Sequence, residues 1–467
     1  MKSRWVLVVL GAVLLLGAGV AAALFLSQRR DVTTTSARAY EAYQEAVANE
    51  NRFYFKEARV GFAKALELDP QFAMAMLGLA RQAKDDEQQE TLVRRAVREK
   101  GRLSERERLH VDMMLAFSEK RYGDAMTIAR ELHAKYLEDV RSAQILARHE
   151  MTLGNPDKAI RIFEDLLAVD PNNAEAYNQI GYYHGYRGEY EKAMEYLTKY
   201  KFIAQDNANP FDSLGEVQAY SGRYNEALEN LNHALAIKPD FIESIGHIAV
   251  AYEGLGDYAR AGEQYEKAAQ LSDSPKMRRE FLMRAMGTRF YAKDWQGLAR
   301  LHGIIKALPY DPKLEKWALL DREFCDAALD LAQDRPVQAE RRLRDLTPRL
   351  DEMIRAEKLP AGYKPHFAGW NMLMALSLEA QGKTDEALAV WQKNVNPPNA
   401  FSDFVQRRHI YEARARVAEI LARRGKLDEA EKLIAENRKW NANWAPTRES
   451  EVAVAELRRA KVLAASK

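Results

Sequence analysis

Residues 174–207 read AEAYNQIGYYHGYRGEYEKAMEYLTKYKFIAQDN, and this stretch contains the residue pattern that predicts the architecture of the chain. Its Gly188 and Ala193 belong to two series of residues that recur at intervals of 34 positions along the chain. The recurring residues are Ala125, Ala159, Ala193, Ala227 and Ala261, and Gly154, Gly188, Gly222 and Gly256. A fixed interval of this length indicates tandem copies of one supersecondary unit.

Each recurring residue type has a physical reason to recur in a pair of packed helices. An alanine at the crossing point lets two helices approach to about 8–10 Å. A glycine in the turn between the helices adopts a left-handed conformation at little cost. A large apolar residue four positions after the alanine, such as Leu197, fills the space beside it. Prolines such as Pro171 and Pro239 close a unit, because proline cannot continue a helix but is tolerated in the first turn of the next one.

These positions resemble the signature of the tetratricopeptide repeat family. The matching residues in the quoted unit are Tyr177, Ile180, Gly181, Gly188, Ala193 and Leu197. The resemblance implies an all-α fold, a right-handed α-solenoid of tandem helical hairpins. We expect a regular array over residues 38–275 and an irregular, repeat-like helical array over 276–467. The second array should end in a capping helix with a polar outer face.

The N-terminal 30 residues predict a membrane anchor. Residues 5–26 contain no charged side chain and have basic residues on both sides. As a helix they would span roughly 33 Å, enough for a hydrocarbon core of about 30 Å. The apolar run continues past the cleavage-like Ala21-Ala22-Ala23, which favours an uncleaved signal-anchor, a single transmembrane helix, over a cleaved signal peptide. Residues 31–37 are interpreted as a short linker.

The anchor predicts a single-pass protein of a bacterial inner membrane. Its signal-like form favours a periplasmic repeat domain, although the basic flanks on the two sides are nearly equal. Two pairs of small residues, Gly17 with Ala21 and Gly19 with Ala23, suit a homodimer through the membrane helix. Small residues are also common in membrane helices that do not dimerise.

Composition narrows the function classes. The chain has 70 basic and 68 acidic residues among 467, a formal net charge of +2, which argues against nucleic-acid binding. A single cysteine, Cys325, leaves no internal disulfide and no CxxC site. The nine histidines lack metal-binding spacing, and the GKT at 382–384 lacks the earlier glycine of a phosphate loop. We therefore expect no metal, no cofactor and no catalytic residue, and the chain is interpreted as a non-enzyme.

The resemblance also implies a binding groove, because the first helix of each repeat lines the concave face in this family. By family register, the groove residues are Arg141, Gln144, Arg148, Asn178, Tyr182, Tyr186, Asp212, Glu216 and Tyr220. Tyr and Arg are frequent interface anchors, so a peptide or partner protein is the expected ligand. The alternative for these side chains is an ordinary solvated inner surface.

Two functions remain open at this stage. The first is a membrane-tethered scaffold or adaptor that binds a peptide or partner protein in the concave groove. The second is a non-catalytic accessory factor of cell-envelope assembly or secretion that contacts glycan or enzyme partners.

Overall fold

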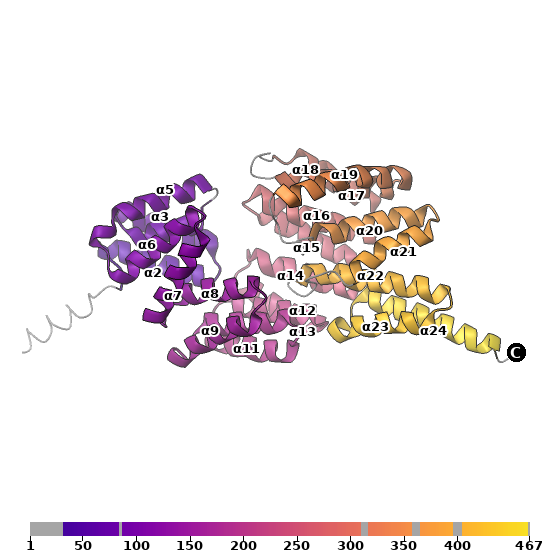
Figure 1. Ribbon diagram of the computed structural model, residues 1–467, viewed down its shortest axis with the longest axis horizontal. Helices are drawn as coiled ribbons and strands as arrows, with labels where there is room; N and C mark the ends of the chain where they lie inside the picture. Colours follow the sequence, from indigo (N-terminus) through magenta and orange to yellow (C-terminus); the bar gives the residue numbers. More distant parts are fainter. Residues whose placement is uncertain (1–30, 84–85, 310–315, 357–364, 396–403, 466–467) are drawn as a thin grey trace, which may run out of the picture. The chain divides into compact units, whose positions relative to one another are not determined.

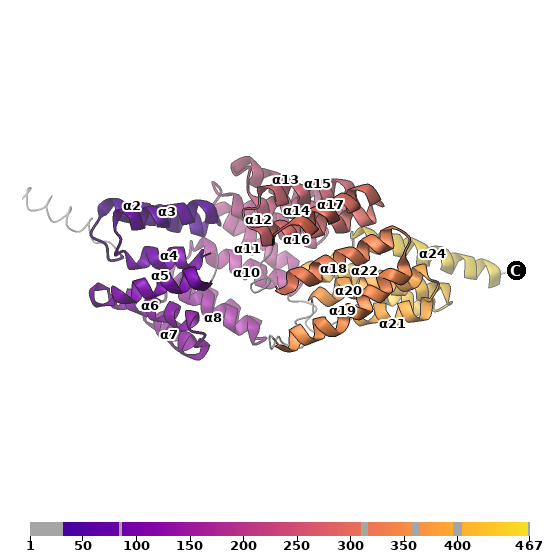
Figure 2. The same cartoon turned by 90° about the horizontal axis from the view of Figure 1, so that it is seen from above.

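The computed structural model describes residues 31–83, 86–309, 316–356, 365–395 and 404–465. These residues form 23 α-helices, α2 to α24, and no β-strand (Figures 1 and 2). None of the helices within these ranges combines the length and the apolar character that a membrane span needs. The transmembrane helix predicted for residues 5–26 lies outside the described residues.

Helices pair in chain order into hairpins, and the chain divides into two compact units between Ala176 and Tyr177. The helices of the first unit are α2 (Ala37–Asn51), α3 (Phe55–Leu68), α4 (Ala73–Arg81), α5 (Asp86–Arg98), η1 (Lys100–Arg102), α6 (Glu105–Ser118), α7 (Tyr122–Lys135), α8 (Val140–Thr152) and α9 (Pro156–Val169). The boundary falls in the first turn of α10 (Ala174–Tyr186).

The second unit contains the rest of α10 and fourteen further helices up to α24. They are α11 (Tyr190–Ile203), α12 (Ala208–Tyr220), α13 (Tyr224–Ile237), α14 (Ile242–Leu255), α15 (Tyr258–Leu271), α16 (Pro275–Tyr291), α17 (Trp295–Ala307), α18 (Lys316–Ala332), α19 (Pro336–Ala356), α20 (Pro365–Ala380), α21 (Thr384–Val395), α22 (Phe404–Arg423), α23 (Leu427–Asn441) and α24 (Ala445–Ala465). The change from regular to irregular repeats expected at residues 275 and 276 falls inside this unit.

The recurring alanines lie inside the helices of the hairpins, and the recurring glycines lie in the turns between those helices. All five recurring alanines are completely buried. The four recurring glycines have φ between +77° and +86°, in the left-handed region that favours glycine. At Gly181, a Cβ would stand 2.6 Å from Cγ of Leu197, so the absence of a side chain lets α10 pack closely on α11.

The segment interpreted as a linker, residues 31–37, is bound to the first unit by hydrogen bonds. The backbone N–H and the hydroxyl of Thr33 donate to the buried carboxylate of Glu107, at 2.6 and 2.7 Å. The Thr34 hydroxyl donates to Asp69 at 2.6 Å. Glu107 also accepts from the N–H of Ser104 in a capping box that starts α6. The three threonines therefore satisfy the carboxylates of the repeats instead of forming a helix.

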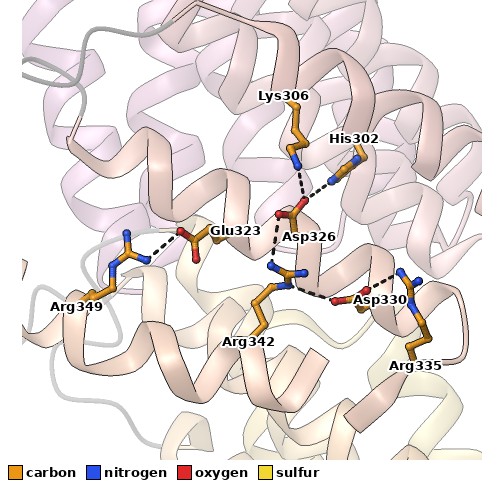
Figure 3. Close-up of polar contacts among 8 residues, drawn as sticks. All are labelled: His302, Lys306, Glu323, Asp326, Asp330, Arg335, Arg342 and Arg349. Atoms are coloured by element: carbon orange, nitrogen blue, oxygen red, sulfur yellow. Dashed lines mark hydrogen bonds and ion pairs between the residues drawn. The ribbon is translucent and has the colours of Figure 1, made fainter. Parts of the chain in front are cut away.

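The loosely patterned stretch after residue 275 owes part of its cohesion to charged side chains. Figure 3 shows Glu323, Asp326 and Asp330 along α18 facing basic residues from α17 and α19. Arg342 Nε donates to Asp330 at 3.2 Å, and its Nη1 lies 3.6 Å from Asp326. The partners on the α19 side, Arg335, Arg342 and Arg349, stand every seventh residue, which is about two helical turns.

Candidate functional site: the inner face of the repeats

The first helices of successive hairpins form the inner face of the array. Contacts that skip one helix join first helices to each other, as α4 to α6, α12 to α14 and α20 to α22. Side chains on these helices therefore face a common side within each unit. This is the surface on which the nine groove residues were predicted.

In the first unit, the predicted groove residues are engaged by other side chains of the chain. Arg141 on α8 lies 3.3 Å from Glu50 on α2, and Arg81 on α4 donates to the same carboxylate at 2.6 and 2.9 Å. Burial opposes ionisation of Glu50, but the two guanidinium groups outweigh it and lower the pKa of the carboxyl. Gln144 donates to Glu175 at 2.8 Å. Arg148 is exposed.

In the second unit, three predicted residues meet a histidine that sequence reasoning did not select. The Tyr182 hydroxyl on α10 donates to Glu216 on α12 at 2.6 Å. His247 on α14 places Nδ1 2.9 Å from Asp212 and Nε2 3.4 Å from Glu216. Burial alone would lower the pKa of His247, but Asp212 and Glu216 raise it to about 9. The pair of carboxylates therefore holds a protonated imidazole at neutral pH. Its signal in the sequence is a histidine directly after Gly246, which lies 34 positions after the predicted groove residue Asp212.

The remaining predicted residues of this unit differ in exposure. Asn178 is 1% exposed, and within the described part of the chain its Oδ1 accepts no hydrogen bond. Tyr182 and Tyr186 are half-buried and stack with ring centroids 6.1 Å apart. Tyr220 is also half-buried and lines a small cavity, described next.

The C-terminal helices cover the continuation of the inner face in the second unit. On the array side, Tyr220, Glu253 and Tyr265 line a cavity of about 20 Å³, which is the volume that one water molecule needs. On the other side the lining includes Arg408 of α22 and Trp444. Arg408 lies 3.2 Å from Glu253, and Figure 1 shows α22 beside α14.

A second buried pair fixes α22 nearby. Tyr291 on α16 donates to Glu412 on α22, and burial raises the pKa of the Glu412 carboxyl. The part of the inner face opposite α22 is therefore occupied by the chain itself.

The end of α23 and the turn that follows it also pack against the turns of the repeats. Asn441 donates to the carbonyl of Tyr220 at 3.1 Å, and Asn443 donates to the carbonyl of Gly222 at 3.0 Å. The ring of Trp440 lies against Gly188. These contacts join residues more than 200 positions apart, so no local sequence pattern reveals them.

The described residues contain no group of three or more His, Cys, Asp or Glu side chains placed to hold a metal ion. Cys325 is buried, and burial raises the pKa of its thiol, which disfavours the reactive thiolate. Lys383 of the GKT lies in the turn between α20 and α21, and its ammonium donates to Glu340 at 3.0 Å. The arrangement on the inner face suits binding through hydrogen bonds and charge.

Comparison with known proteins identifies the repeat. Two family models described as tetratricopeptide repeat match residues 146–210 and 242–275. No curated protein sequence matches the chain.

Three solved structures illustrate the likeness in fold. MamA is 24% identical with a TM-score of 0.29, and the match covers 34% of this chain and 93% of that one. A tetratricopeptide repeat protein from Parabacteroides merdae is 14% identical with a TM-score of 0.36, over 62% of this chain and 99% of that one. The APC/C hetero-tetramer Cut9–Hcn1 is 12% identical with a TM-score of 0.48, over 89% of this chain and 76% of that one.

All three TM-scores are below 0.5, so none of these proteins indicates what this chain binds. The evidence for the family is the pair of matching models, which fall on helical hairpins spaced at the 34-residue interval. The chain contains tetratricopeptide repeats, matched over residues 146–210 and 242–275.

Proposed function

We propose that this chain is a membrane-tethered scaffold that binds a peptide or partner protein on the inner face of α10, α12 and α14. Tetratricopeptide repeats are generally scaffolds for protein–protein interaction, and two family models match this chain. The observation that carries the choice of surface is the half-buried pair of stacked tyrosines, Tyr182 and Tyr186. Rigid aromatic side chains beside hydrogen-bonding groups are typical anchors of protein interfaces.

The choice of α10, α12 and α14 also follows from the contacts that other parts of the chain make with the rest of the inner face. The inner face farther along, at Tyr220 and Glu253, is packed against α22 and the turn before α24. In the first unit, Arg141 is held by Glu50. Tyr182, Tyr186 and Glu216 keep partial exposure.

The membrane tether rests on the sequence of residues 5–26, which is uncharged and long enough to span a bilayer. Tethering would raise the local concentration of the repeats at the membrane and of anything they hold. Fractionation tests this part: the full chain should sediment with membranes and resist extraction by high salt, whereas a chain lacking residues 1–30 should not. Equal fractionation of the two would refute the tether.

Photo-cross-linking in intact membranes tests the binding surface. A photoreactive amino acid replaces Tyr186, and captured proteins are identified. We expect one recurrent partner whose capture is strongly reduced by Tyr182→Ala. Tyr122→Ala serves as the matched control, because Tyr122 is 59% exposed and begins a second helix in the other unit. Equal capture by all variants would show that the surface is wrongly assigned.

A further inference from the structure

The inner faces of this protein repeatedly hold cationic side chains with carboxylates. Glu50 holds Arg81 and Arg141 in the first unit. In the second unit, Glu253 holds Arg408, and Asp212 with Glu216 holds His247. In each case a carboxylate on one first helix binds a cation from a different helix. The chain therefore shows, with its own residues, the chemistry that this surface accepts.

The segment of the inner face on α10, α12 and α14 carries an excess of carboxylates. Asp212, Glu216 and Glu243 contribute three carboxylates, and His247 is the cation placed between the first two. Burial raises the pKa of the Glu243 carboxyl, which indicates that its charge is poorly compensated by its surroundings. A cation that approaches this face would therefore be attracted, and an acidic segment would be repelled.

An unpartnered acceptor lies on the same helix face as Tyr182. Asn178 stands one helical turn before Tyr182, which places the two side chains on the same face of α10. Asn178 is 1% exposed, yet its Oδ1 accepts no hydrogen bond from the residues that the structure describes. A buried acceptor without a donor costs about 1–3 kcal/mol, so a donor that displaces the side chains covering Asn178 would recover part of that energy.

We propose that the inner face of α10, α12 and α14 recognises a basic segment of a partner protein by binding an arginine side chain. Glu216 and the Oδ1 of Asn178 supply acceptors, and the rings of Tyr182 and Tyr186 offer faces for a guanidinium group. Arg408 on Glu253 is the intramolecular counterpart of this contact. The proposal names the partner class of the proposed scaffold and rests on that function.

Fluorescence anisotropy tests the partner class with defined probes. The full chain in detergent is titrated into labelled octapeptides that alternate glycine with arginine, glutamine or glutamate. We expect the arginine peptide to bind and the glutamate peptide not to bind. Glu216→Gln should weaken the arginine peptide by about tenfold or more, since a charge-assisted hydrogen bond is lost. Glu229→Gln, an exposed change on the second helix α13, should leave binding unchanged.

The outcomes separate this proposal from the scaffold function. If the arginine and glutamate peptides bind equally, or if Glu216→Gln binds as the parent does, arginine recognition is wrong. If Glu216→Gln melts at a lower temperature and is unsuitable, Glu243→Gln removes a second carboxylate of the same face and should also weaken binding. Capture through Tyr186 that depends on Tyr182 but not on Glu216 would keep the scaffold and reject the basic partner. Absence of any such capture would reject both.

Discussion

Arg408 on α22 donates through Nη1 to both carboxylate oxygens of Glu253 on α14, at 3.2 and 3.3 Å, across 155 residues of sequence. Glu253 is 7% exposed, so the pair is largely removed from water. An ordinary solenoid repeat contacts only its neighbours in the array. In the second unit, by contrast, a late helix is bound to an early one by a charge pair, and the unit is closed on itself.

The first prediction concerns that pair. Glu253→Gln or Arg408→Gln should each lower the free energy of unfolding by about 3 kcal/mol, because each leaves a buried charge without its partner. The double variant should lose less than the sum of the two single losses. Chemical denaturation of the four proteins measures the coupling energy, expected at about 0.5–3 kcal/mol. Strict additivity would mean that the two side chains do not interact in solution.

The second prediction uses two glycines with almost the same backbone conformation. Gly188 has φ +78° and Gly382 has φ +75°, but a Cβ at Gly188 would stand 2.2 Å from the Trp440 ring, whereas nothing lies within 4 Å at Gly382. Gly382→Ala should cost about 1–2 kcal/mol from backbone conformation alone. Gly188→Ala should cost clearly more, because Trp440 must also move. Adding Trp440→Ala to each variant should remove this difference, and equal losses in the two single variants would contradict the packing of Trp440 on Gly188.

The third prediction tests the close packing of a hairpin. Ala193 is completely buried, so Ala193→Trp should overpack the crossing and lower stability by about 1–3 kcal/mol or more. Ala460→Trp introduces the same side chain at an exposed helical position and should change stability little. Thermal melting of the two variants beside the parent decides the matter. If Ala193→Trp has the same melting temperature as the parent, the helix crossing at Ala193 is not tightly packed.

The all-α repeat architecture could be predicted from the sequence because the residues that specify each repeat lie close together in the chain. Gly188 and Ala193 lie five residues apart, and the same pair returns one repeat later as Gly222 and Ala227. Each repeat needs a residue that tolerates positive φ in its turn and a small residue at its helix crossing. The same residue types therefore recur at the same positions of each repeat. The family models and the helical structure confirm this prediction.

The closure of the second unit could not be predicted in the same way. Asn441 bonds to the backbone of Tyr220, and Arg408 bonds to Glu253, each through contacts that occur once. A contact that does not repeat has no periodic signature. The region of α18 and α19 escaped the repeat pattern for a different reason: Ala339 and Leu343, both completely buried, keep the pair of a small and a large apolar residue, but the interval from Ala261 is not a multiple of 34.

The candidate site was only partly accessible to sequence reasoning. Family register selected Tyr182, Asp212 and Glu216, and the structure places these three in one hydrogen-bonded group. The register omitted His247, because the residue that corresponds to Asp212 one repeat later is Gly246. The omitted histidine carries the positive charge of the group. Whether the group binds a partner stays a prediction.

The last prediction follows from the protonation of His247. Its pKa is raised from 6.5 to about 9 in the folded protein by Asp212 and Glu216, against the opposing effect of burial. The folded state therefore binds this proton more tightly than the unfolded state does. The resulting stabilisation is complete below pH 6.5 and is lost as the pH rises through 9. The size of the loss is about 3 kcal/mol at most, since one pKa unit corresponds to about 1.4 kcal/mol.

Urea denaturation at a series of pH values measures this effect against His247→Gln. The variant cannot bind the proton, so it should be less stable than the parent at pH 6.5, and the difference should shrink as the pH approaches and passes 9. Comparing the two proteins at each pH cancels the titration of every other group that they share. A difference that stays constant across this range would mean that the two carboxylates do not hold a charged imidazole. In that case Asp212 and Glu216 would face each other without a cation between them, and the acceptor excess on this face would be larger still.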